Sequence, residues 1–74
     1  MHALRTIRDN NARLAECLSV ENRDPAKWGL ARYVGLNFYS FEEFNTERER
    51  NLASIEWGNN RGGHHTKLFN PISL

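Results

Sequence analysis

The chain has 74 residues, of which 39% are hydrophobic and 26% are charged, and its formal net charge at pH 7 is +1. This length allows one domain, residues 1–74, and the single cysteine, Cys17, excludes an internal disulfide. The sequence contains no apolar run of the roughly 18–20 residues that cross a bilayer. Because charged residues also interrupt the N-terminal segment, we expect no signal peptide, no membrane association and a cytoplasmic setting.

Residues 3–20 are predicted to form a helix, because apolar residues recur along one face. The residues of this stripe are Leu4, Ile7, Asn11, Leu14 and Leu18. Their spacing is that of heptad positions a and d, and a polar asparagine at an a position can fix register and strand number in paired helices. The stripe therefore predicts either a seam between subunits or a face that packs on the protein's own helices.

A second helix is predicted over residues 25–36. Asp24 suits the N-cap, and Pro25 suits the first helical position, where a backbone amide is not needed. Gly29 and Gly35 weaken this interpretation, because glycine disfavours helix interiors by about 1 kcal/mol relative to alanine. Aromatic and β-branched residues gather at 33–39, so a short strand there is the alternative.

A third helix is predicted over residues 41–57, where Ser40 and Glu43 have the spacing of a capping box and Gly58 supplies a stop. Residues 59–74 show no period and are expected to form an extended C-terminal arm that docks through its apolar residues, either on this chain or on another. The alternative for the arm is a hairpin in which 66–69 pair with 54–57. We therefore expect an all-α fold, a small three-helix domain with a C-terminal arm.

No pattern in the sequence indicates catalysis, a cofactor or a metal site. His2, Cys17, His64 and His65 lack the paired spacing of a structural zinc site. Cys17 with a histidine base would need an oxyanion hole and a substrate cleft, and no motif suggests either. We therefore expect a protein that is not an enzyme.

Aromatic residues make up 11% of the chain, more than a small three-helix core can bury. Tryptophan and tyrosine at a surface are preferred anchors of protein interfaces. The candidate protein-binding residues are Trp28, Tyr33, Phe38, Tyr39, Trp57 and Phe69.

Nucleic-acid binding is the second hypothesis, because the turn-rich segment 59–67 could hold phosphates together with the basic first helix. The candidate contacts are Arg5, Arg8, Arg13, Arg61 and Lys67. The few residues between the second and third predicted helices would make a helix-turn-helix. Glu42 and Glu43 would then begin its recognition helix, where they would repel phosphates.

The favoured interpretation is a small regulatory protein that binds and modulates a larger protein partner. Antirepressors and enzyme inhibitors among phage and plasmid accessory proteins have this size and this lack of catalytic motifs. We expect a homo-oligomer, most simply a dimer, because a domain this small has a core worth only about 3–5 kcal/mol net. A structural assembly subunit is a third possibility.

Overall fold

The computed structural model describes residues 2–60 and 62–72, except for the side chains of residues 2–10 and of Asn60. The chain forms α1 (His2–Glu21), β1 (Trp28–Val34), β2 (Asn37–Phe44), α2 (Glu47–Asn60) and β3 (His64–Phe69). The fold is α+β, with two helices and a three-stranded antiparallel sheet in this part of the chain, so the all-α prediction is wrong. Neither helix is long and apolar enough to cross a membrane over the described residues.

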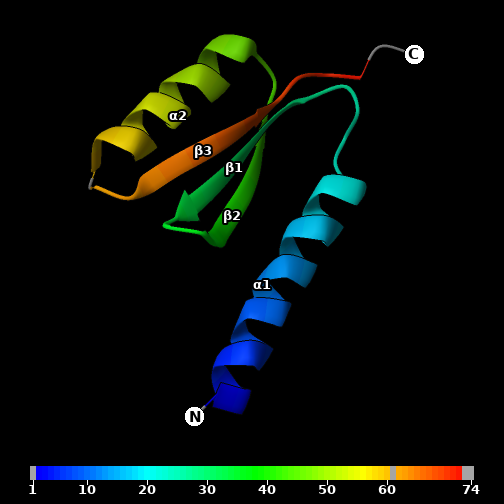
Figure 1. Cartoon of the computed structure of the whole chain (residues 1–74). Coiled ribbons are helices and arrows are strands. Elements are labelled where there is room, and N and C mark those ends of the chain that lie inside the picture. The colour runs from blue at the N-terminus through cyan, green and yellow to red at the C-terminus, as the bar shows by residue number, and fades with distance from the viewer. Residues whose placement is uncertain (1, 61, 73–74) are drawn as a thin grey trace.

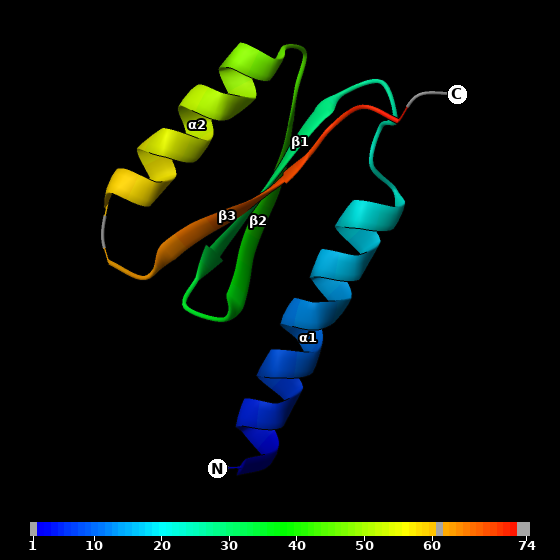
Figure 2. The same cartoon turned by 45° about the horizontal axis from the view of Figure 1, so that its top comes forward.

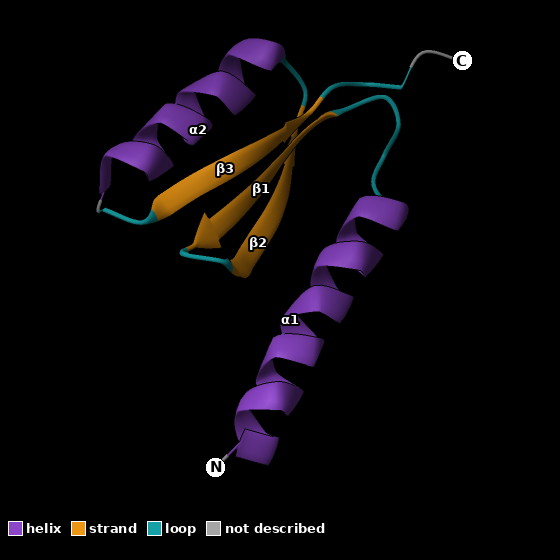
Figure 3. Cartoon of the chain, in the orientation of Figure 1, coloured by secondary structure: helices purple, strands orange, loops and turns teal. Residues whose placement is uncertain are grey.

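The sheet has the strand order β2-β1-β3, so β1 is central and pairs antiparallel with both neighbours. The helices lie on opposite sides of the sheet, with α2 along one face and α1 across the other (Figures 1 and 3). The N-terminal half of α1 extends well beyond the strands, as the second view also shows (Figure 2). The protein therefore has three layers, α2, the sheet and α1, and the N-terminal half of α1 projects beyond them.

The predicted helix over 25–36 is instead a turn followed by β1. The Asp24 carboxylate accepts a hydrogen bond from the Ala26 amide at 2.9 Å, so it caps a single turn that does not continue. Leu30 and Ala31 point to opposite faces and are both fully buried, which requires the twofold alternation of a central strand. Gly35 then has φ of +62° as the first central residue of the β1–β2 turn, a role that favours glycine.

The predicted helix over 41–57 is also wrong, because residues 41–44 belong to β2. The helix begins later, at Glu47, and Thr46 caps it. The Thr46 hydroxyl accepts a hydrogen bond from the Glu49 amide at 3.2 Å and lies 2.9 Å from the Glu49 carboxylate. Thr46 is thus the N-cap of α2 and bonds both the amide and the carboxylate of Glu49, whereas the similarly spaced pair Ser40 and Glu43 lies within a strand.

The predicted arm contains β3, which pairs with β1. The hairpin alternative fails because residues 54–57 lie within α2. Beyond β3, the tail docks on the turn after α1. The Ile72 amide donates to the Pro25 carbonyl at 2.8 Å, and the Arg23 guanidinium donates to the Asn70 carbonyl at 2.6 Å. Residues 70–72 therefore dock within the same chain.

Candidate functional site

A surface groove lies between α2 and the β2 side of the sheet. Helix α2 packs mainly on β3 and β1, which leaves the neighbouring part of the same face open. The groove has a volume of about 350 Å³. Its lining residues come from β1, β2 and α2, and they are Arg32, Tyr39, Ser40, Glu42, Ala53, Glu56 and Trp57. We call it the Tyr39–Trp57 groove.

A β-bulge directs Tyr39 into this groove. Arg32 pairs with Ser40, whereas the next residue, Tyr33, pairs with Phe38, so Tyr39 is the extra residue on β2. A bulge interrupts strict alternation and can turn a side chain toward a functional site. As a result Tyr39 and Ser40, although adjacent in sequence, both line the groove. The Tyr39 side chain remains 64% exposed.

Contacts from three elements fix the Trp57 ring. Its indole N–H donates a hydrogen bond to the Tyr33 carbonyl at 3.1 Å. The His64 ring stacks on it with centroids 4.2 Å apart and an interplanar angle of 19°. Tyr39 adds a tilted contact, with centroids 4.9 Å apart. The groove therefore has a rigid aromatic wall that is set before any partner arrives.

The groove also carries an ion pair and a net negative charge. The Arg32 guanidinium lies 2.9 Å from a Glu42 carboxylate oxygen and 5.8 Å from the centroid of the Trp57 ring. Glu56 is a second, exposed carboxylate on the α2 side. Because Arg32 balances only one of the two carboxylates, the lining has a formal charge of −1. An aromatic wall with an acidic rim is suited to a basic side chain of a partner.

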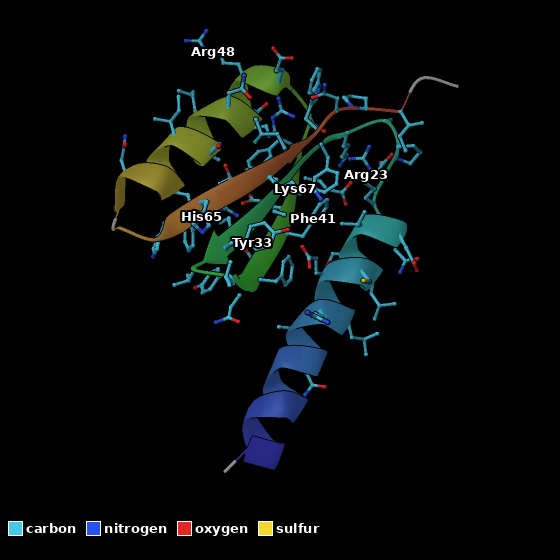
Figure 4. All side chains as sticks on the ribbon, viewed as in Figure 1. Arg23, Tyr33, Phe41, Arg48, His65 and Lys67 are labelled. Carbon is cyan, nitrogen blue, oxygen red and sulfur yellow. The ribbon has the colours of Figure 1, made fainter. Side chains whose placement is uncertain are left out.

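The six aromatic residues predicted to bind protein are divided between the two faces of the sheet. Tyr39 and Trp57 meet in the groove. Trp28 lies on the same face near its other end, where it packs under Arg50. The remaining three, Tyr33, Phe38 and Phe69, lie on the α1 face and are half-buried. Figure 4 shows Tyr33 between the sheet and α1.

Tyr33 forms the main polar link between the sheet and α1. Its hydroxyl donates a hydrogen bond to the Glu16 carboxylate. Burial, together with this hydrogen bond and the negative charge of Glu16, raises the pKa of Tyr33 from 10.0 to about 12. The phenol is therefore held protonated as a structural donor.

The predicted seam residues lie along α1. Asn11, Leu14 and Leu18 are all exposed. The positions of Leu4 and Ile7 are helical, but their side chains are outside the described set.

The predicted phosphate contacts are not brought together among the described side chains. Arg13 is exposed on α1, and Lys67 is exposed on β3. Lys67 shares a hollow with Glu16 and Glu21, which lower the positive potential around its ammonium group. Arg61 and the side chains of Arg5 and Arg8 lie outside the described set.

Sequence reasoning did not find the polar members of the groove, chiefly Arg32 and Glu42. A usable signal was the gathering of aromatic and β-branched residues at 33–39, which is typical of a strand. The prediction of a helix over residues 25–36 obscured this signal.

Comparisons of the chain with protein-family models, curated proteins and solved structures found no match.

Proposed function

We propose that this chain is a small, non-catalytic regulatory protein that binds a larger protein through the Tyr39–Trp57 groove and modulates it by occupying part of its surface. The observation that carries the proposal is the exposed Tyr39 ring held against an immobilised Trp57 ring. Rigid aromatic anchors with a polar rim dominate binding energy at protein interfaces. The single cysteine supports a cytoplasmic setting for this activity.

The charge around the groove favours a protein over a nucleic acid. Glu42 and Glu56 form its acidic rim, and only Arg32 among the lining residues is a cation. A nucleic-acid surface needs several cations at phosphate spacing, because affinity depends on the number of phosphates neutralised. We therefore infer a protein partner that presents a basic or aromatic side chain.

Site-specific photocrosslinking tests the proposal. Tyr39→p-benzoylphenylalanine places a photoreactive aromatic group at the exposed edge of the groove. Leu36, which is fully exposed at the β1–β2 turn, is the matched control position for the same group. The variants would be irradiated in cells that naturally express the protein, and the products would be identified by mass spectrometry.

We expect a discrete protein adduct from position 39, resistant to nuclease, and none from position 36. Glu56→Lys, which reverses the charge on the rim, should reduce that adduct. Equal adducts from both positions, or adducts that nuclease removes, would overturn the assignment of the groove to a protein partner. Adducts that nuclease removes would instead favour the nucleic-acid hypothesis.

A further inference from the structure

The outer face of α1 carries two exposed leucines in its described half, and the sheet does not cover them. The residues of α1 that face the sheet are half-buried, namely Ala12, Glu16, Ser19 and Val20. Leu14 and Leu18 lie on the opposite side of the helix and are 58% and 48% exposed. In the sequence, Leu4 and Ile7 continue the same heptad spacing toward the N-terminus. The stripe therefore has no partner within the described part of its own chain.

The chain exposes more surface than a compact monomer of its mass, and the excess is about the area that one subunit buries in a standard interface. Its accessible surface is 5758 Å², whereas a compact monomer of 8.6 kDa exposes only about 4700 Å². The radius of gyration is 13.5 Å, against about 11 Å for a compact domain of this length. The excess area, roughly 1000 Å² on the scaling for monomers, is close to the roughly 800 Å² that each subunit contributes to a stable interface.

We propose that a second copy of this chain covers the outer face of α1, so that two α1 helices pack antiparallel about a twofold axis near Asn11. Residue 11 lies at the middle of α1, His2–Glu21, so full overlap of two antiparallel helices sets Asn11 beside its symmetry mate. An amide side chain both donates and accepts hydrogen bonds, so the two Asn11 side chains can pair. Residues 14 and 18 of one copy then meet the heptad positions 7 and 4 of the other, as a self-complementary interface requires.

The shape of the subunit selects the antiparallel arrangement. The sheet is attached to the C-terminal half of α1, and the N-terminal half projects free of it (Figures 1 and 2). In an antiparallel pair each projecting half lies along the outer face of the partner's C-terminal half, and the two sheets stand at opposite ends. In a parallel pair the two projecting halves would pack only on each other, and both sheets would stand at the same end of the helix pair.

Light scattering on the purified full chain tests this interface. We expect a mass of two chains for the parent protein and of one chain for Leu14→Glu/Leu18→Glu, with unchanged circular dichroism. The matched control is Leu52→Glu/Ile55→Glu on the outer face of α2, where the two residues are 57% and 60% exposed. This control should remain dimeric. A monomeric parent protein, or a dimer that only the α2 variant disrupts, would overturn the proposal.

Cysteine crosslinking tests the orientation without charged substitutions. In a Cys17→Ser background, Asn11→Cys should form an intermolecular disulfide on oxidation, since the two positions meet at the twofold axis. Leu18→Cys should not form an intermolecular disulfide, because residue 18 of one copy lies beside residue 4 of its antiparallel partner. Crosslinking of Leu18→Cys as efficiently as Asn11→Cys would overturn the antiparallel arrangement. The α1 face and the Tyr39–Trp57 groove lie on opposite sides of the sheet, so this proposal stands apart from the proposed function.

Discussion

The guanidinium of Arg50 lies over the Trp28 ring, 5.1 Å from its centroid, and is almost fully buried. The same guanidinium donates hydrogen bonds to the Phe69 carbonyl at 3.0 Å and to the Asn70 side-chain oxygen at 2.9 Å. No carboxylate among the described residues forms an ion pair with it. Hydrogen bonds and an aromatic face therefore compensate the buried charge, and they join α2 to the end of β3.

Arg50→Ala is expected to destabilise the protein by about 2–3 kcal/mol, because it leaves buried acceptors unpaired and removes packing from Trp28. Urea unfolding followed by fluorescence would measure the change. Arg48→Ala is the control, because Arg48 projects from the outer side of the same helix (Figure 4) and should leave stability unchanged. Equal effects of the two substitutions would contradict the role given to Arg50.

Gly29→Ala is expected to destabilise the fold by about 1–3 kcal/mol through overpacking. A Cβ atom at this position would lie 2.8 Å from the tip of the Phe41 ring and 3.1 Å from the Cβ atom of Phe69. Gly58→Ala is the opposite case, since its Cβ atom would meet nothing within 4 Å and alanine favours a helix by about 1 kcal/mol. Thermal unfolding should therefore show opposite shifts for the two variants, and a neutral Gly29→Ala would show that the aromatic pair is loosely packed.

Thr46→Ala is expected to cost about 1 kcal/mol, because it removes the cap of α2. Ser40→Ala should cost less, since the Ser40 hydroxyl accepts only a long hydrogen bond of 3.5 Å from Arg32. Chemical denaturation of both variants makes the comparison. A larger loss of stability for Ser40→Ala than for Thr46→Ala would place the start of the helix at residue 41 and contradict the α2 boundary described above.

Stability is expected to fall as the pH rises from about 10 to about 12. The pKa of Tyr33 is 10.0 when unperturbed and about 12 in the fold, so the unfolded chain loses this proton first and rising pH favours unfolding. The contribution is fully present below pH 10 and lost as the pH passes through the folded pKa. Tyr33→Phe should remove this part of the pH dependence.

Phenolate absorbance tests this assignment directly in a Tyr39→Phe background, which leaves Tyr33 as the one tyrosine of the chain. Its midpoint should lie near pH 12 while circular dichroism reports a folded protein. Glu16→Gln should lower that midpoint, because it removes the carboxylate charge. A folded protein that titrates near pH 10 would contradict the hydrogen bond between Tyr33 and Glu16.

The first helix could be predicted because its signal is local. A heptad stripe is contained within the segment itself, and the observed bounds, His2–Glu21, differ little from the predicted 3–20. The strands depend on distant partners. Phe41 packs against Phe69 with ring centroids 5.6 Å apart, and that contact favours a strand where the local sequence resembles the start of a helix.

Two neighbouring capping signals show the same limitation. Ser40 with Glu43 and Thr46 with Glu49 have identical spacing, and only the pairing of β2 with β1 decides that Thr46 caps the helix.

The groove was predictable only in part, because its residue types are local and its geometry is not. Tyr39 and Trp57 are aromatic residues suited to an interface, but the bulge opposite Arg32 that brings them together has no local sequence mark.

The central position of β1 has a consequence for folding during synthesis. Its β2 partner follows directly along the chain, whereas its β3 partner is added only with residues 64–69. A nascent chain that ends before His64 therefore leaves one edge of its most buried strand without a partner. Unpaired edges of this kind template aggregation, so chains truncated ahead of β3 should be insoluble, whereas loss of residues after β3 leaves that edge paired.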